Sequence, residues 1–282
     1  NYVKDYYPFM PEKNKDKAAL KFILQLLQKE AGSSVQAAVL TLTKLLSAEN
    51  KIVPDVDRLY NVLQSAKDIT KQSKANSLEN ILKNNYEKYL IYTQYIATQR
   101  YIYKTLISLG LTVEKFDGKM SLDEKLLAIE KFKTTSRVMI STKSGGEGWN
   151  FQFCRNIINY DLPWNPMEIE QRIGRIHRIG QTEEVNIYNL SAAGTIESYI
   201  LSILDEKINM FQLIIGEMDM ILGDVDGRDF ETNIFDIWIK SKTSEELEQK
   251  ISDLGNEIME KKMMYLEVKE FDRKLFGDKY IS

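Results

Sequence analysis

The sequence is poor in the residues that build disulfides, zinc sites and imidazole-based active sites. Cys154 is its one cysteine, so neither an intramolecular disulfide nor a multi-cysteine zinc site can form. His177 is its one histidine, which excludes a catalytic dyad of two imidazoles. We therefore expect no metal site within this chain.

Long apolar runs are also missing. No run approaches the ~20 residues that a membrane-spanning helix needs, and nothing resembles a signal peptide. We therefore expect a cytoplasmic protein without a membrane partner. The chain begins with Asn1 and not with Met, which suggests a fragment or a processed product.

A phosphate-binding loop is the third missing feature. The sequence contains no Gly-x-x-x-x-Gly-Lys-Ser/Thr segment, and no Asp-Glu pair follows an apolar strand to hold magnesium. The chain therefore cannot grip a nucleoside triphosphate in the usual way. Its formal net charge of -3 leaves a nucleic-acid partner open, because such a partner requires only a locally basic surface.

What the sequence does contain is a strong α/β pattern. With 43% hydrophobic residues in 282, the chain can bury a core of one or two domains. From Lys88 onward, short runs rich in Val, Ile and Tyr alternate with helical patterns. Strands are predicted at 89–93, 112–116, 137–141, 156–160 and 185–190, and helices at 94–109, 121–132 and 166–175. This alternation predicts βαβ units and a RecA-like parallel sheet flanked by helices.

Both flanks of this α/β segment are predicted to be mainly helical. Helices are expected at 17–27, 35–46, 77–82, 195–215 and 244–270, the second of them behind a serine cap, whereas 223–235 is rich in turns and acidic residues. Leu247, Ile251, Leu254 and Ile258 form an apolar seam in the last helix, too short to indicate a coiled coil and expected to pack on its own domain. We predict three parts: a helical segment 1–87, an α/β lobe 88–222 and a helical tail 223–282.

A glycine-rich segment follows the third predicted strand. It reads Ser141-Thr142-Lys143-Ser144-Gly145-Gly146-Glu147-Gly148-Trp149-Asn150. Ligands of open α/β sheets bind beyond the carboxyl ends of strands, and glycines there allow backbone N–H groups to approach phosphate. The alternative is a glycine-rich turn without a ligand.

Two prolines bracket a Trp-Asn pair after the fourth predicted strand. Trp164 and Asn165 lie between Pro163 and Pro166, at a junction from strand to helix. The pair can contact the backbone or bases of a nucleic acid. The alternative is that Trp164 fills an edge of the domain.

The next predicted helix carries an arginine face. At about 100° per residue, Gln171, Arg172, Arg175 and Arg178 fall within about a third of its circumference. Guanidinium groups so close together repel one another unless an anion neutralises them, and phosphates are suited to their forked geometry. The alternative is a solvated face, or salt bridges to nearby glutamates.

Together, these segments resemble the carboxy-terminal helicase lobe, RecA-like lobe 2, of Swi/Snf-type ATPases in helicase superfamily 2, and in particular its bacterial RapA-like members. Residues 141–150 resemble motif V, with Trp149 where leucine is usual. Residues 161–166 resemble the Asp-x-x-Trp-Asn-Pro signature and 171–181 resemble motif VI. Residues 89–95 are similar to motif IV, and 116–118 to the turn that follows it.

The resemblance implies a DNA-dependent ATPase that moves along double-stranded DNA. ATP with Mg²⁺ would be held by an N-terminal RecA-like lobe of the same polypeptide, which would supply the Mg²⁺ ligands. Arg172 and Arg175 would be catalytic and reach that ATP across a cleft. The other residues implied at the nucleotide are Gly146, Glu147, Gly148, Gln171 and Arg178. Those implied at the nucleic acid are Thr142, Lys143, Gly118, Asn150, Trp164 and Asn165.

Two further consequences belong to the same resemblance. This chain alone would be inactive, and in a bacterium it would be associated with the nucleoid. Two alternatives stay open: the lobe of a strand-separating DNA or RNA helicase, and a non-catalytic module that docks nucleic acid or protein.

Overall fold

A computed structural model describes residues 14–47, 55–70, 72–83, 86–146, 148–177, 184–207, 221–222 and 230–276. These residues belong to two compact units. The first comprises residues up to 163 together with 172–197, and the second comprises 164–171 together with 198 onward. Each unit is described separately below.

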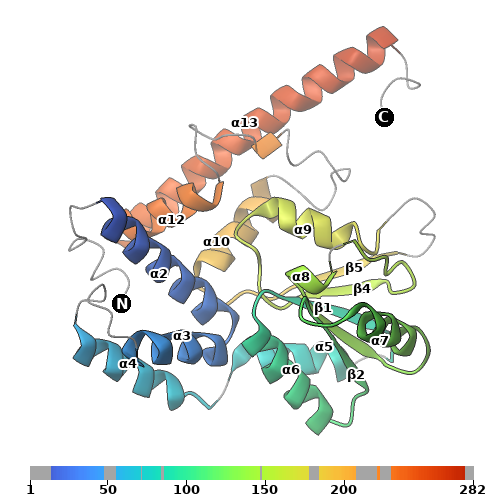
Figure 1. The fold of residues 1–282 in the computed structure, drawn as a ribbon. Helices are drawn as coiled ribbons and strands as arrows, with labels where there is room; N and C mark the ends of the chain where they lie inside the picture. Colours follow the sequence, from blue (N-terminus) through green and yellow to red (C-terminus); the bar gives the residue numbers. More distant parts are fainter. Residues whose placement is uncertain are drawn as a thin grey trace. The chain divides into compact units, whose positions relative to one another are not determined.

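The first unit contains a parallel five-stranded sheet, as predicted (Figure 1). Its strands are β1 (Tyr89–Thr93), β2 (Val113–Phe116), β3 (Val138–Thr142), β4 (Asn156–Asn159) and β5 (Asn186–Asn189), in the order β2-β3-β1-β4-β5. Each lies within a residue or two of its predicted position. β1, β3 and β4 are buried along their whole length, because strands of a parallel sheet are covered on both faces.

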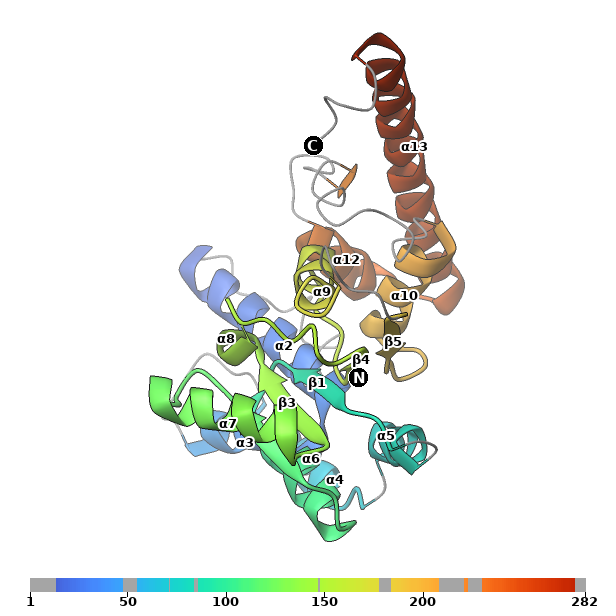
Figure 2. The ribbon, with the colours of Figure 1, turned by 90° about the vertical axis from the view of Figure 1, so that its right-hand side faces the viewer.

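Helices cover both faces of this sheet (Figures 1 and 2). One face packs against α5 (Ser73–Lys83) and α6 (Ile96–Ser108), with Leu82 and Ile102 among the buried contacts. The other packs against α7 (Leu122–Thr134), with Phe132 completely buried. Ser121 begins α7 with a reciprocal capping box to Glu124.

A smaller helical cluster completes the first unit. It is formed by α2 (Asn14–Ser33), α3 (Val35–Ser47) and α4 (Val56–Lys67), which meet at Leu27, Leu42, Leu59 and Leu63. The serine cap of the second predicted helix is confirmed, because Ser34 Oγ accepts from the Ala37 N–H at 3.2 Å. Helix α4 was not predicted.

The second unit is helical. α9 (Pro166–Ile173) and α10 (Ile196–Ser202) each cross the border between the units; a π-helical turn η2 (Ile203–Lys207), α12 (Phe230–Lys240) and α13 (Ser244–Phe276) follow. The predicted apolar seam of α13 is buried from Leu247 to Ile258, next to η2 and α12. The prediction of turns up to Phe235 is wrong from Phe230, where α12 begins with its apolar side buried. Residues 208–215 of the predicted long helix lie outside the described residues.

None of the helices described is both long and apolar enough to cross a membrane.

Candidate active-site edge and nucleic-acid interface

The parallel strands of the first unit place their carboxyl ends along one edge of the sheet. The turn after β2 contains Gly118, the short helix α8 (Lys143–Gly146) follows β3, and Asp161 follows β4. Several predicted site residues are thereby brought to the edge where open α/β sheets bind ligands.

Close packing accounts for two glycines of the glycine-rich segment. A Cβ on Gly145 would lie 2.4 Å from the Phe116 carbonyl oxygen, and one on Gly146 would lie 2.9 Å from Ser141 Oγ and from the Tyr92 ring. Glycine is therefore required at both positions because α8 lies too close to β1, β2 and β3 for a Cβ to fit. Gly148 differs, because it is exposed and its φ of 81° favours glycine. Glu147 lies outside the described residues.

Asp161 is the most heavily bonded carboxylate at this edge. Its Oδ2 accepts from Ser33 Oγ at 2.7 Å and from Thr93 Oγ1 at 2.5 Å, and the Gln94 N–H donates to Oδ1 at 2.9 Å. Only 2% of the residue is exposed. A buried carboxylate is tolerated when its lone pairs are satisfied in this way, so Asp161 ties the end of α2 to the end of β1.

Arg172 is an internal residue, and its predicted role at ATP stays a prediction. Its Nη1 donates to Asn159 Oδ1 at 2.9 Å and to the Asp161 carbonyl at 3.0 Å, and its guanidinium lies 5.3 Å from the Tyr92 ring centre. Nη2 is 3.8 Å from Asp161 Oδ1, and the residue is 5% exposed. Its charge is therefore neutralised inside the lobe and is not presented to an external phosphate.

Arg175 is placed differently. It follows the last residue of α9, where its N–H donates to the Arg172 carbonyl and its own carbonyl accepts from the Phe151 N–H at 2.9 Å. The backbone of Arg175 is thus fixed to the lobe, while the residue is partly exposed. Arg178 lies outside the described residues.

The Tyr92 side chain lies beside these groups, and its hydroxyl has no hydrogen-bond partner among the described residues. Burial raises its pKa, against the opposing effects of Arg172 and Arg175. Tyr92 therefore stays neutral and acts as an apolar platform under Arg172.

Of the residues of the first unit that are predicted to contact nucleic acid, three are exposed and one is buried. Lys143, Gly118 and Asn150 are exposed, and the Asn150 side chain is held by paired hydrogen bonds to Gln152 at 3.0 Å. Thr142 is only 3% exposed, and its hydroxyl has no hydrogen-bond partner among the described residues. Its side chain is therefore buried, and its contact with nucleic acid stays a prediction.

In the second unit, Trp164 is also buried. It is 2% exposed and stacks on Phe235, with ring centres 6.0 Å apart. The ring therefore packs within the second unit, as the alternative reading expects, and its contact with nucleic acid stays a prediction. Asn165 and Gln171 are exposed, and Asn165 Oδ1 accepts from the Met167 N–H at the start of α9.

Sequence reasoning missed a buried ion pair behind this edge. Lys74 Nζ lies 2.5 Å from Glu197 Oε2 and also donates to the Tyr160 carbonyl at 3.0 Å. Glu197 Oε1 accepts from the Leu162 N–H at 3.2 Å, and burial raises the pKa of its carboxyl. No local pattern could reveal this pair, because 123 residues separate its members. Asp161, in contrast, was visible as a carboxylate directly after an apolar strand.

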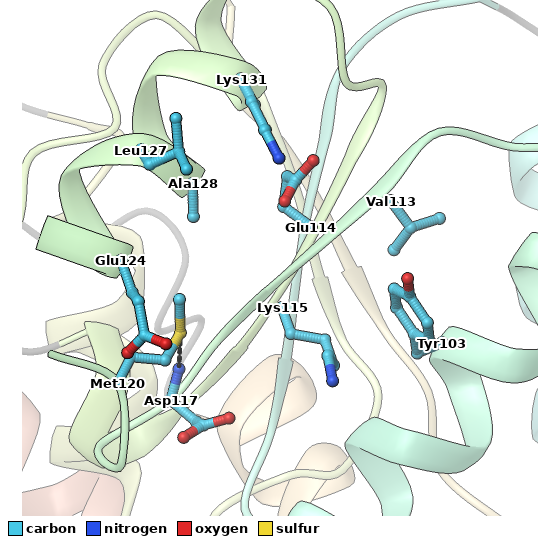
Figure 3. Close-up of a pocket in the computed structure, with 10 residues that line it drawn as sticks. All are labelled: Tyr103, Val113, Glu114, Lys115, Asp117, Met120, Glu124, Leu127, Ala128 and Lys131. Atoms are coloured by element: carbon cyan, nitrogen blue, oxygen red, sulfur yellow. Dashed lines mark hydrogen bonds between the residues drawn. The ribbon is translucent and has the colours of Figure 1, made fainter.

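A separate cavity of about 300 Å³ opens beside the edge strand β2 (Figure 3). Tyr103, Leu127 and Lys131 line it from α6 and α7, and Glu114 and Lys115 line it from β2. It combines apolar walls with charges of both signs. None of the predicted site residues lines it.

Comparisons with known proteins point to one family. The sequence model of the "Helicase conserved C-terminal domain" matches residues 73–180. The chain is 39% identical to the "Uncharacterized ATP-dependent helicase YqhH" of Bacillus subtilis, over 88% of this chain and 45% of that protein. It is 34% identical to "Helicase SWR1" of Saccharomyces cerevisiae, over 54% of this chain and 10% of that protein. The chain thus spans less than half the length of these relatives.

A solved structure supports the fold. The crystal structure of the C-terminal part of the Fun30 ATPase domain matches with a TM-score of 0.52 and 20% identity, over 83% of this chain and 91% of that one. The RecA-like helicase C-terminal fold is therefore confirmed, while the narrower resemblance to RapA stays a prediction. The chain carries a helicase conserved C-terminal domain and is homologous to the Swi/Snf-type ATPases of helicase superfamily 2.

Proposed function

We propose that this chain is the C-terminal motor lobe of an ATP-dependent double-stranded DNA translocase, and that it contributes Arg175 to an ATP site shared with another RecA-like lobe. The observation that carries the proposal is the contrast between two arginines. Arg172 is enclosed by Asn159 and Asp161, whereas Arg175 has an anchored backbone and is itself partly exposed. An arginine held in this way is suited to stabilising negative charge that it meets only when two lobes close.

The residues of this chain fit the arginine-bearing half of an ATP site shared by two lobes. They offer a guanidinium and a glycine turn, but the sequence has no phosphate loop and no Asp-Glu box for Mg²⁺. When bound by the other lobe, ATP with Mg²⁺ supplies the phosphoryl group to be transferred. Arg175 would donate to its oxygens and balance their charge, with Arg178 as a second candidate.

DNA is the proposed nucleic acid. Exposed Lys143, Gly118 and Asn150 at the carboxyl edge, and exposed Asn165 on the second unit, are the candidate contacts with its backbone. One relative, 33% identical over half of this chain, is named "ATP-dependent DNA helicase DDM1". The Asp-x-x-Trp-Asn-Pro signature favours translocation on duplex DNA over strand separation.

The test is an Arg175→Ala substitution in the protein that contains both lobes. We expect DNA-stimulated ATP hydrolysis to fall by ~10³–10⁵-fold, as for other arginine fingers, while DNA affinity is unchanged. Arg100→Ala is the matched control. Arg100 is exposed on α6, which packs on one face of the sheet, whereas Ile176, the neighbour of Arg175, packs on the other face. Wild-type turnover in Arg175→Ala would refute the assignment.

Two further measurements separate the alternatives. The 282-residue chain by itself should hydrolyse no ATP above background, with or without DNA, and robust DNA-stimulated hydrolysis by it would contradict a shared site. An unwinding assay on the two-lobe protein distinguishes strand separation from translocation. A module used only for docking would show neither activity.

A further inference from the structure

The C-terminal half of α13 displays apolar side chains that none of the described residues of its own unit covers. Ile258 is fully buried, but Met264, Val268, Phe271 and Leu275 are 64%, 59%, 62% and 59% exposed. Residues 259–276 extend the helix by about 27 Å at 1.5 Å per residue. In proteins most helical stability comes from the packing of an apolar face, so the exposed apolar side chains of this extension call for a partner.

These four residues form one narrow stripe, which we call the α13 stripe. Their spacing is four, three and four residues, so they fall within about 60° of arc around the helix. This is the spacing of the core positions of a coiled coil. Exposed apolar patches of this kind mark interaction sites.

The charges beside the stripe indicate which partner fits it. Glu267 and Lys274 occupy the same flank, one heptad apart. If a second copy packs antiparallel, Glu267 of each helix faces Lys274 of the other. In a parallel pair, Glu267 would instead face Asp272, and these like charges would repel one another.

The apolar layers agree with the antiparallel arrangement. Met264 then meets Leu275 of the second copy, and Val268 meets Phe271 of the second copy, so that each layer combines a larger with a smaller or more flexible side chain. A parallel pair would instead set the two Phe271 rings against each other. Lys274 now pairs with Glu270 within its own helix at 2.8 Å, but both groups are about two-thirds exposed, and such a pair holds the lysine only weakly.

We propose that the α13 stripe is a self-association surface through which two copies of this chain pair antiparallel. The proposal rests on α13 alone and is independent of the proposed motor function.

The test measures the mass of the 282-residue chain by sedimentation over a range of concentrations. We expect a monomer–dimer equilibrium, and Val268→Asp with Phe271→Glu should raise its dissociation constant at least about 100-fold by removing the apolar layers. Met263→Glu is the matched control, because Met263 is 54% exposed on α13 but lies off the stripe. Circular dichroism and thermal unfolding of each variant check that it is folded.

Exchanging the charges of Glu267 and Lys274 tests whether the two helices pair antiparallel. Glu267→Lys alone and Lys274→Glu alone should each weaken the dimer about 2- to 5-fold, and the double exchange should restore it. A mixture of Val268→Cys and Phe271→Cys chains should form mixed disulfides faster than either variant with itself; Cys154 is buried and gives little background. A chain that is monomeric throughout, or a dimer unaffected by the stripe variants, would overturn the proposal. So would preferential 268–268 cross-linking.

Discussion

At the scale of single residues, Asp161 is the most informative side chain. Its carboxylate is buried and satisfied by Ser33, Thr93 and Gln94, with Arg172 alongside. Removing it would leave the Arg172 charge buried without its counter-ion and three donors without their acceptor.

We therefore expect Asp161→Ala to lower the free energy of unfolding of the chain by about 3–5 kcal/mol, measured by urea denaturation. Asp123→Ala, an exposed aspartate in the first turn of α7, is the control and should cost less than about 1 kcal/mol. A loss for Asp161→Ala no larger than the control's would mean that this network contributes little.

The same residues show where sequence reasoning stops. Helical periodicity predicts Arg172 and Arg175 on one face of a helix, but α9 ends at Ile173 and Arg175 lies in the turn that follows. Periodicity also cannot show that the Asp161 carboxylate and the Tyr92 ring enclose Arg172 and not Arg175. That depends on how the segment packs on the sheet. The packing of the Trp164 ring was hidden for the same reason: Phe235, which stacks on it, is 71 residues away in the sequence.

At the scale of elements, the strands were predictable and some helices were not. Buried parallel strands are continuous apolar runs, and all five runs mark real strands. Helix α4 was missed although its buried leucines, Leu59 and Leu63, keep the i, i+4 spacing of a helix. α12 was missed because acidic and turn-forming residues precede it, although its apolar side is regular.

The junction between β3 and α8 yields a prediction about backbone packing. Gly145→Ala should destabilise the chain by about 1–3 kcal/mol, because the new methyl group would collide with the Phe116 carbonyl, which belongs to a strand and cannot move freely. Gly148→Ala is the matched comparison, since it meets no atom within 4 Å and is strained only by its positive φ.

Thermal unfolding of Gly145→Ala and Gly148→Ala distinguishes a steric collision from backbone strain. Gly145→Ala should show the larger loss. Equal losses would mean that backbone strain and not close packing is what requires glycine in this segment.

At the scale of the whole molecule, a buried carboxyl makes stability depend on pH. Glu30 in α2 is 7% exposed, and one of its oxygens accepts from Thr41 while the other has no partner in the described structure. Burial raises its pKa from 4.5 to about 7. The folded chain therefore binds the proton more tightly than the unfolded chain, and this contribution to stability is present below about pH 4.5 and is lost as the pH rises through 7.

As the pH rises from 5 to 8, we expect the free energy of unfolding of the wild-type chain to fall by roughly 1–2 kcal/mol more than that of Glu30→Gln. This energy includes a reduction for the screening of the carboxylate charge by water. Urea denaturation at several pH values measures the difference. Using the glutamine variant as reference removes the contribution of Glu197, whose raised pKa acts in the same direction. Parallel pH profiles for the two proteins would contradict the role given to Glu30.

The family, the sheet and the location of the candidate site at its carboxyl edge could all be anticipated from motifs in order along the chain. The division at residues 87/88 and 222/223, and the individual nucleotide and DNA contacts, stay predictions. No motif predicts the polar network between the helical segment and the sheet. Ser33 bonds to Asp161 and Lys74 to Glu197, and in both pairs the partner is more than a hundred residues further along the chain.

That network has a practical consequence for anyone who shortens this protein. A truncation that begins at Lys88 would keep every helicase motif and yet discard Ser33 and Lys74. Glu197 would then lie against the Leu162 backbone as a charge without its ammonium, and Asp161 would lose one donor. The smallest useful piece of the first unit therefore begins in α2, well ahead of the first recognisable motif.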